Sequence, residues 1–201
     1  MDFPIRSRAI AGWFVAIFAL AGGGACGHVS VSELVIGLQL ANYVPTPVHT
    51  AHRMLTLAGV GPEDVVYDLG SGDGRLVVLA ASAYGARGVG IELDQDLVER
   101  SRRNAVAAGV SDRVRFVVGD LMTVDLRGAT VVTSYLYPST MERLRPRLLA
   151  QLPAGARIVS HAFAMGDWAP DAVERFLYDA GWPGVVYLWR VPVAGSVSSE
   201  G

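Results

Sequence analysis

Short apolar runs rich in β-branched residues alternate with amphipathic stretches along most of the chain. The apolar runs predict strands at residues 65–69, 87–92, 114–118, 130–135 and 157–163, and a terminal strand or hairpin arm at 185–191. The amphipathic stretches predict helices over residues 75–82, 94–108, 139–152 and 170–180. Because strands alternate with helices, we expect parallel βαβ units, which form an α/β sheet with helices on both faces.

Three residues refine the expected helix boundaries. Asp94 is expected to cap the helix over residues 94–108, and Gly109 is expected to end it. Pro146 lies inside the helix predicted over residues 139–152. Since proline removes a helical hydrogen bond, that helix should have a kink there or begin late.

The first 44 residues differ in pattern from the rest of the chain. Residues 9–26 carry no charge and approach the length needed to cross a bilayer, and residues 34–44 form a further apolar stretch suited to an interfacial helix. We expect residues 1–44 to be a membrane anchor or signal-like segment and residues 45–193 to be the folded domain. The small, polar residues 194–201 are expected to be a disordered tail.

The apolar run at residues 9–26 has three interpretations. It can be a signal peptide that is cut after Ala19-Leu20-Ala21, an uncleaved anchor, or a lipoprotein signal that ends at Cys26. The third is disfavoured because Gly23 stands where such signals usually have leucine. Arg6 and Arg8 precede the run and favour a cytoplasmic N-terminus, which for a single crossing would export the domain.

Composition removes several classes of function. The formal net charge of −2 provides no overall attraction to nucleic acid. Cys26 is the only cysteine, which excludes an intrachain disulfide and a cysteine-based metal site. The four histidines have no tight ligand spacing, so we expect no metal centre.

A glycine-rich motif follows the strand predicted at residues 65–69. Residues 68–74 read Asp-Leu-Gly-Ser-Gly-Asp-Gly, so Gly70, Gly72 and Gly74 are spaced by two. Glycines at this spacing let the backbone turn tightly and approach a ligand closely. The motif lies where ligands bind in such sheets, at the carboxyl end of a strand. Asp68 precedes the first glycine, where a buried strand tolerates a carboxylate only with partners.

Two further acids stand at the ends of the next predicted strands. Glu92 ends the second strand, where a carboxylate can accept hydrogen bonds from ribose hydroxyls. Asp120 ends the third strand after Gly119, where a side-chain oxygen can accept a hydrogen bond from the exocyclic amine of adenine. The alternative is that these residues are helix caps or loop acids. Three acids at three consecutive strand ends favour a nucleotide-like ligand.

The spacing of the glycines distinguishes two ligands. A dinucleotide site requires G-x-G-x-x-G, whereas this chain has G-x-G-x-G after an acid, which suits a positively charged ligand. The residues from Asp68 to Gly74, with Glu92 and Asp120, resemble class I S-adenosylmethionine-dependent methyltransferases over residues 47–190. This resemblance implies a Rossmann-like sheet and a set of S-adenosylmethionine-binding residues: Asp68, Gly70, Ser71, Gly72, Gly74, Glu92, Leu93, Asp120 and Leu121.

A narrower resemblance extends beyond this core. The run Tyr-Val-Pro-Thr-Pro at residues 43–47, with the segments around the three acids and "YLYPSTMERLRPRL", resembles the family of ATP synthase c-subunit lysine N-methyltransferases and its prokaryotic relatives. The resemblance implies that Tyr43 to Pro47 form a lid over the methionine end of the cofactor, with Tyr43 and Thr46 in contact with it. A rigid entry loop is the plain alternative for Pro45 and Pro47, and both interpretations can hold.

The acceptor side is expected after the fourth strand, where the chain reads "TSYLYPST". The Asn/Asp-Pro-Pro-aromatic motif of enzymes that methylate adenine amines or glutamine amides is absent. Tyr135, Tyr137 and Pro138 instead suit a narrow aromatic channel for an extended amine, such as a lysine side chain. Tyr137 as a plain surface aromatic is the alternative. No general base is evident, and positioning can supply much of the catalysis of methyl transfer.

The expected cofactor bears on the compartment. S-adenosylmethionine is a cytosolic metabolite, so we favour a membrane-anchored protein with its catalytic domain in the cytoplasm, over secretion by a cleaved signal. A hairpin formed by both apolar stretches would return the chain to the cytoplasmic side. The expected partner is a protein substrate, which a membrane-anchored enzyme could find among membrane proteins. A small-molecule or RNA methyltransferase and a non-catalytic nucleotide-binding module remain alternatives.

Overall fold

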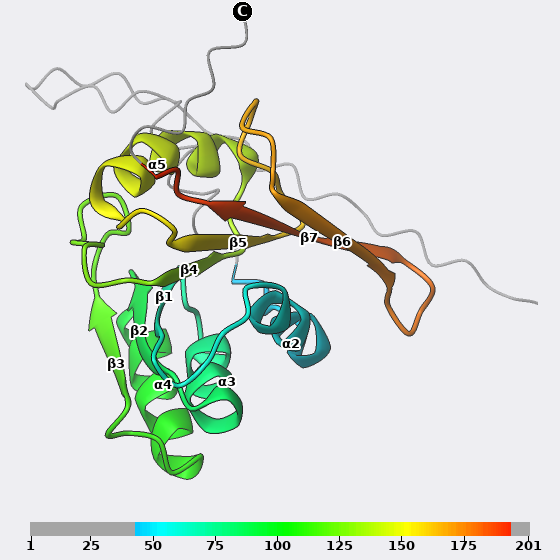
Figure 1. Ribbon diagram of the computed structural model, residues 1–201. Coiled ribbons are helices and arrows are strands. Elements are labelled where there is room, and N and C mark those ends of the chain that lie inside the picture. Colours follow the sequence, from blue (N-terminus) through cyan, green and yellow to red (C-terminus); the bar gives the residue numbers. More distant parts are fainter. Residues whose placement is uncertain (1–42, 194–201) are drawn as a thin grey trace, which may run out of the picture. The chain divides into compact units, whose positions relative to one another are not determined.

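A seven-stranded sheet in the order β3-β2-β1-β4-β5-β7-β6 forms the centre of the computed structural model, which describes residues 43–193 (Figure 1). The strands β1 to β5 are parallel to one another, whereas β7 is antiparallel to both β5 and β6. The strands are β1 Val65–Leu69, β2 Arg87–Glu92, β3 Val114–Val118, β4 Val131–Ser134, β5 Arg157–His161, β6 Ala172–Leu177 and β7 Pro183–Arg190. The helices are α2 Val48–Leu57, α3 Arg75–Tyr84, α4 Gln95–Ala107 and α5 Pro138–Gln151.

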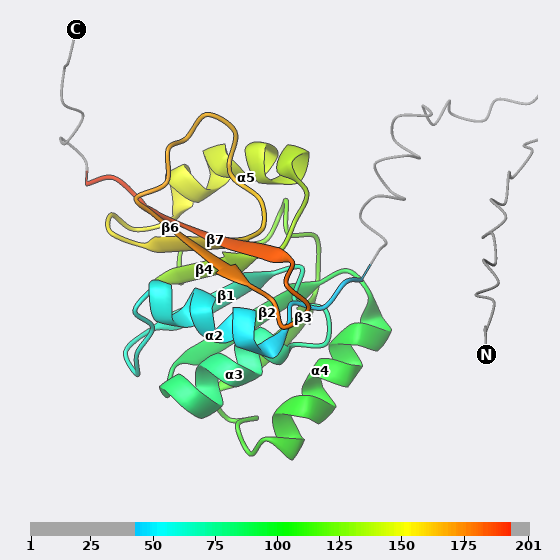
Figure 2. The same cartoon turned by 90° about the vertical axis from the view of Figure 1, so that its right-hand side faces the viewer.

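Helices cover both faces of the sheet, as the sequence predicts. The α5 helix lies on one face, and α2, α3 and α4 lie on the other (Figures 1 and 2). Met141, Leu144 and Leu148 of α5 pack with Ile158 and Trp189 of the sheet into one fully buried cluster. Burial on both faces explains why all four residues of β4 are buried.

Most of the predicted elements are confirmed within a few residues. The bounds of β1, β2 and β3 agree with the sequence-based prediction, and Asp94 caps α4 by accepting hydrogen bonds from two backbone N–H groups. The α5 helix begins at Pro138 and runs through Pro146, so it does not begin late. The β5 strand ends at His161, two residues before the predicted end, because Ala162 adopts a left-handed φ of 66°.

The helix predicted over residues 170–180 is wrong, because this segment forms β6 instead. Pairing with β7 replaces helical hydrogen bonds, and alternate β6 residues face α2. Phe176 packs into the cluster that α2 shares with the sheet, while Glu174 forms an ion pair with Arg53 of α2. The Arg53 guanidinium also lies 4.7 Å from the Phe176 ring centroid. Tertiary contacts of period two therefore override the local helical pattern.

The α2 helix is an element that the sequence interpretation missed. Ala51, Met54 and Leu55 lie on one of its faces and are at most 1% exposed. Their spacing of three and one is a helical signal in the printed sequence. Pro47 at the N-cap makes no side-chain capping bond, so the usual polar start signal is missing.

The predicted anchor and tail fall largely outside the described residues. Residues 1–42, which hold the apolar run at 9–26, and residues 194–201 are not part of the described structure. Within residues 43–193, no helix combines the length and the apolar character that a membrane crossing requires.

Candidate active site

The carboxyl ends of β1, β2, β4, β5 and β6 meet at one edge of the sheet. The β1 strand lies between β2 and β4, so the order of the strands reverses at this point. Asp68 of β1 is in register with Gly90 of β2 and with Thr133 of β4. Since β6 is antiparallel to β7 and β7 is antiparallel to β5, β6 also ends at this edge. The predicted ligand-binding residues are therefore brought to the topological switch point.

The glycine loop, residues 70–74, adopts the conformation that its sequence predicts. Gly70, Gly72 and Gly74 all have positive φ, at 78°, 54° and 75°. Gly74 has a second constraint, because a Cβ there would lie 2.6 Å from Phe116 Cε1 and 2.7 Å from the Ser101 Cβ. The loop thus packs too closely against β3 and α4 for any side chain at position 74.

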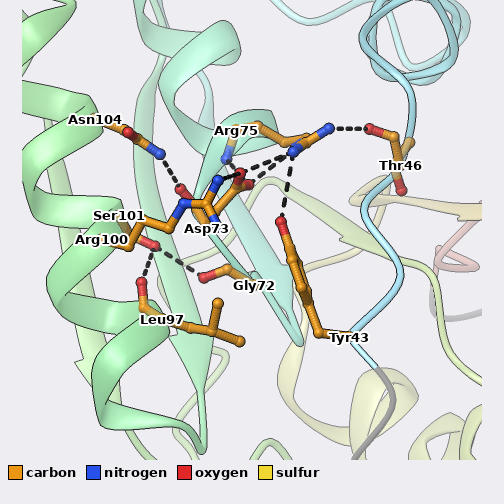
Figure 3. A network of polar contacts seen from close by, with 9 residues as sticks. All are labelled: Tyr43, Thr46, Gly72, Asp73, Arg75, Leu97, Arg100, Ser101 and Asn104. Carbon is orange, nitrogen blue, oxygen red and sulfur yellow. Dashed lines mark hydrogen bonds and ion pairs between the residues drawn. The ribbon is translucent and has the colours of Figure 1, made fainter.

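Side chains from α4 hold the glycine loop in place (Figure 3). The Ser101 hydroxyl donates to the Gly72 carbonyl at 2.9 Å, and the Asn104 amide donates to the Asp73 carbonyl at 2.8 Å. The Asp73 carboxylate, in turn, accepts two hydrogen bonds from the Arg75 guanidinium, at 2.9 and 2.8 Å. These contacts preorganise the loop, which lowers the cost of ordering its backbone when a ligand binds.

The segment Tyr43 to Pro47 crosses the glycine loop. A Cβ built on Gly72 would lie 2.4 Å from Tyr43 Cε2, so the tyrosine ring packs directly against this glycine. Arg75 holds the segment by donating from Nη2 to the Tyr43 hydroxyl at 3.4 Å and from Nη1 to the Thr46 carbonyl at 3.2 Å (Figure 3). The structure therefore places Tyr43 and Thr46 beside the loop.

Asp68 is the buried carboxyl at the centre of the edge. It is 7% exposed, and its Oδ1 accepts a hydrogen bond from the Thr133 hydroxyl at 2.8 Å. Burial raises its pKa from 3.8 to about 7; the Thr133 bond opposes this, and the charges of Glu92 and Asp73 add to it. A cation bound at this edge would stabilise the Asp68 carboxylate and lower its pKa again. Ser71, within the glycine loop, has a buried hydroxyl without a hydrogen-bond partner among residues 43–193.

Glu92 links the end of β2 to the glycine loop. Its Oε2 accepts from the Gly72 N–H at 2.9 Å, while its Oε1 accepts from the N–H groups of Leu93 at 2.8 Å and Asp94 at 3.1 Å. These backbone donors fix the carboxylate and leave part of its acceptor capacity for ligand hydroxyls. Leu93 beside it is 52% exposed and offers an apolar surface at the same edge.

Asp120 and Leu121 follow β3. The Asp120 side chain is exposed, and its Oδ1 accepts from the Met122 N–H at 2.7 Å, so one oxygen caps its own turn. Leu121 is only 6% exposed and belongs to the core cluster beneath α5. Its side chain is therefore committed to the core, which leaves its backbone for any contact with a ligand.

The aromatic cluster, defined as Tyr135, His161, Phe163 and Tyr178, occupies the ends of β4, β5 and β6. The Tyr135 ring centroid lies 4.1 Å from that of His161 and 5.9 Å from that of Phe163. The His161 Nε2 lies 2.8 Å from the Tyr178 hydroxyl. The pKa of Tyr135 is raised by burial and then by the neighbouring phenols of Tyr178 and Tyr137. Three phenols thus converge on one side of the switch point.

Tyr137 and Pro138 lie at the rim of this cluster. Tyr137 is 42% exposed, and its ring centroid is 6.1 Å from that of Phe163. Pro138 is the first residue of α5, a position where proline loses no helical hydrogen bond. The structure therefore gives Pro138 a role in starting the helix, and only Tyr135 of the three predicted acceptor-side residues lies in the cluster.

His161, Phe163 and Tyr178 were missed by the sequence interpretation. His161 and Phe163 flank Ala162, whose φ of 66° accompanies a tight turn closed by the Phe163 N–H and the His161 carbonyl at 2.9 Å. Tyr178 was hidden because its segment was predicted to be helical. For His161 and Phe163, the available signal was that each stands at the end of a β-rich run, as Tyr135 does.

Comparisons with known proteins agree with this geometry. A family model described as the ANTKMT methyltransferase domain matches residues 68–172. A protein-lysine N-methyltransferase from Saccharolobus islandicus is 38% identical over 74% of this chain and 92% of its own length. The mouse adenine nucleotide translocase lysine N-methyltransferase is 42% identical over 77% of this chain, which spans 64% of that protein.

A solved structure provides a further comparison. The crystal structure of an RNA methyltransferase from Salinibacter ruber, in complex with S-adenosyl-L-homocysteine, contains a chain that is 54% identical to this one. The match covers 74% of this chain and 94% of that chain, with a TM-score of 0.71.

The mixed sheet with its reversal at β1, the glycine loop and the acids at the strand ends define a class I S-adenosylmethionine-dependent methyltransferase. Within that class, this chain belongs to the ANTKMT methyltransferase domain family.

Proposed function

We propose that this methyltransferase transfers a methyl group from S-adenosylmethionine to the ε-amino group of a lysine in a protein substrate. The observation that carries this proposal is the division of one sheet edge into an acidic half and an aromatic half. Asp68 and Glu92 stand at the ends of β1 and β2, and Tyr135, His161 and Tyr178 stand at the ends of β4, β5 and β6. A cationic methyl donor suits the first half, and an extended amine suits the second.

The acidic half supplies the proposed cofactor contacts. Asp68 faces the positive charge of the donor. Glu92 accepts hydrogen bonds from the ribose hydroxyls, and Asp120 accepts a hydrogen bond from the exocyclic amine of adenine. The glycine loop, with Gly70, Ser71, Gly72 and Gly74, brings backbone N–H groups to the ligand. The exposed Leu93 side chain offers a surface to the adenine ring, and Leu121 contributes its backbone.

The aromatic half supplies the proposed amine site. Nucleophilic attack requires a neutral lysine, and deprotonation of an ordinary lysine at pH 7 costs about 4.6 kcal/mol. Uncharged aromatic walls offset part of this cost, because they disfavour the ammonium relative to the amine as water is excluded. The amine lone pair forms the new N–C bond, and the C–S electron pair goes to sulfur, which leaves S-adenosylhomocysteine.

RNA is the second candidate acceptor, because the 54% identical solved relative is described as an RNA methyltransferase. The formal net charge of −2 and the absence of an Asn/Asp-Pro-Pro-aromatic motif weigh against a nucleobase acceptor. Two of the relatives named above are, in contrast, named as lysine N-methyltransferases. These observations favour protein lysine.

The test is methyl transfer from labelled S-adenosylmethionine by the full chain to three separate pools: membrane proteins, soluble proteins and total RNA. Label in protein, mapped by mass spectrometry to a lysine, would support the proposal, and label confined to RNA would overturn it. Binding without label in any pool would indicate a non-catalytic module. Asp68→Asn should abolish the transfer, whereas Asp125→Asn at an exposed loop should not.

We also propose that the catalytic domain works in the cytoplasm, where its methyl donor is made, with residues 1–44 as its membrane anchor. The support is the uncharged run at residues 9–26 and the need for a cytosolic cofactor. Membrane fractionation with protease protection tests this. Two results would contradict the proposal: a domain that resists protease added to the cytoplasmic side of the membrane, or a chain that does not sediment with membranes.

A further inference from the structure

His161 is held by hydrogen-bonding groups on both sides of its ring. Its Nδ1 lies 3.4 Å from the Thr46 hydroxyl, and its Nε2 lies 2.8 Å from the Tyr178 hydroxyl. The side chain is 3% exposed, and the Tyr135 ring packs against it at a centroid distance of 4.1 Å. The turn at Ala162 fixes the backbone that carries it. The imidazole therefore has one orientation and two defined partners.

The imidazole in this position is neutral at physiological pH. Burial and then the neighbouring His49 lower the pKa of His161 from 6.5 to about 4. A neutral imidazole has one donor nitrogen and one acceptor nitrogen. Either tautomer satisfies both contacts: the phenol O–H donates to Nε2 and the Nδ1–H donates to Thr46, or the Nε2–H donates to Tyr178 and the Thr46 hydroxyl donates to Nδ1.

The first of these tautomers determines what Tyr178 can offer to an incoming group. With its proton directed at His161, the Tyr178 oxygen presents only lone pairs, so it accepts hydrogen bonds and donates none. A neutral amine has two N–H donors and one lone pair. An acceptor that holds an N–H also sets the direction of the lone pair, which must point in line with the methyl–sulfur bond.

We propose that Tyr178 is the hydrogen-bond acceptor that orients the lysine amine, and that His161 is the positioning residue that keeps the Tyr178 proton turned away from it. This inference rests on the proposed function. The ammonium loses its proton to water before attack, the amine nitrogen bonds the methyl carbon, and sulfur takes the C–S electron pair. The methylammonium product carries the positive charge away, so His161 stays neutral throughout.

The first test is a double-mutant cycle on kcat for a lysine acceptor. Tyr178→Phe and His161→Leu should each lower kcat about tenfold to a hundredfold, because the amine is no longer oriented, while the affinity for S-adenosylmethionine stays the same. The double variant should be no more than about twofold worse than either single variant, since the pair acts as a unit. His161→Gln, which retains an acceptor for the phenol, should recover part of the loss.

Tyr84→Phe is the matched control. It removes a tyrosine hydroxyl that contacts His52 Nδ1 at 3.0 Å on the outer surface of α2 and α3, so a histidine–tyrosine bond is lost away from the site. It should leave kcat unchanged. Losses in the cycle that add independently, or a loss in Tyr84→Phe of equal size, would overturn the proposal.

The second test needs no activity. Nitrogen-15 NMR of the histidine rings, with His161 assigned by its absence in His161→Gln, should show the Nδ1–H tautomer at pH 7 and a changed Nε2 signal in Tyr178→Phe. A charged ring or the opposite tautomer would overturn the assignment of the pair alone. Failure of the wild type to methylate any lysine would instead overturn the proposed function, and the role of Tyr178 with it, whatever the NMR shows.

Discussion

The ring of Tyr43 occupies the space that a side chain at position 72 would need, since a Cβ on Gly72 would be 2.4 Å from Tyr43 Cε2. The contact joins the segment before α2 to the loop after β1, two parts of the chain that the sheet does not pair. It makes Gly72 a requirement of the packing of the segment Tyr43 to Pro47 as well as of the turn.

Gly72→Ala should therefore weaken S-adenosylmethionine binding by tenfold or more. Gly59→Ala is the matched control, because Gly59 has a similar φ of 61° but has open space around its Cβ position. Both variants should lose about 1–2 kcal/mol of stability through left-handed strain. Calorimetric titration and thermal unfolding separate the two effects. Equal cofactor affinities in the two variants would show that the Tyr43 contact is unimportant.

Arg75→Met should destabilise the protein and loosen the segment Tyr43 to Pro47. The Asp73 side chain is only 6% exposed, and the change removes the bidentate partner of its carboxylate. It also removes the hydrogen bonds that hold Tyr43 and Thr46. We expect a loss of about 1–3 kcal/mol in the free energy of unfolding, measured by denaturant titration.

The chain contains a matched pair for this experiment. Arg127 donates to Asp125 across the same two-residue spacing, but both side chains are more than 60% exposed. Arg127→Met should leave stability and cofactor affinity unchanged. A similar loss in both variants would indicate that the removal of a positive charge, rather than the loss of the contacts with Tyr43 and Thr46, determines the result.

The titration of Asp68 should contribute to the pH dependence of the free energy of unfolding of the ligand-free protein. Between about pH 4 and 7 only the native protein holds a proton on this carboxyl, so its contribution makes the free energy of unfolding fall as pH rises. A pKa of about 7 instead of 3.8 corresponds to about 4 kcal/mol at most. Asp68→Asn should remove this dependence and be more stable than wild type at pH 8. An unchanged pH profile in thermal unfolding would contradict the buried-carboxyl assignment.

Binding of the cationic donor should release protons. At pH 7 the Asp68 carboxyl is close to half protonated, and a nearby positive charge lowers its pKa. Titrations in two buffers of different ionisation enthalpy should reveal about half a proton released per S-adenosylmethionine bound. S-adenosylhomocysteine, which lacks the sulfonium charge, should release less. Equal proton release by the two ligands would show that the sulfonium charge does not lie near Asp68.

His161 should contribute the opposite slope. Between about pH 4 and 6.5 only the unfolded chain protonates this imidazole, so its contribution makes stability fall as pH falls. Because the slopes of Asp68 and His161 oppose each other over this range, the wild type should show a flatter profile than either variant. His161→Gln should be relatively more stable at pH 5 than at pH 8. Thermal unfolding across this range checks the prediction.

The sequence predicted best what is local to a strand and the loop after it. Asp68, the glycines and Glu92 each follow an apolar run, so their common position at the sheet edge follows from parallel pairing alone. The contact of Arg75 with Thr46 was not predictable in this way, since it joins residues 29 positions apart through an unpaired segment.

The aromatic half was predicted only in part for a related reason. Tyr135 follows a recognisable strand, but Tyr178 follows β6, where the local pattern favours a helix and the pairing with β7 decides. Its partner His161 comes from a different strand, and a hydrogen bond between two strand ends has no local signature.

Because the acids come from β1 and β2 and the aromatic rings come from β4, β5 and β6, the proposed donor site and the proposed acceptor site are encoded in separate stretches of the chain. Substitutions in the later stretch can change which molecule is methylated while the methyl donor stays the same. Members of the family can therefore diverge by substitutions at the ends of β4, β5 and β6 alone. Relatives with the same glycine loop need not share an acceptor.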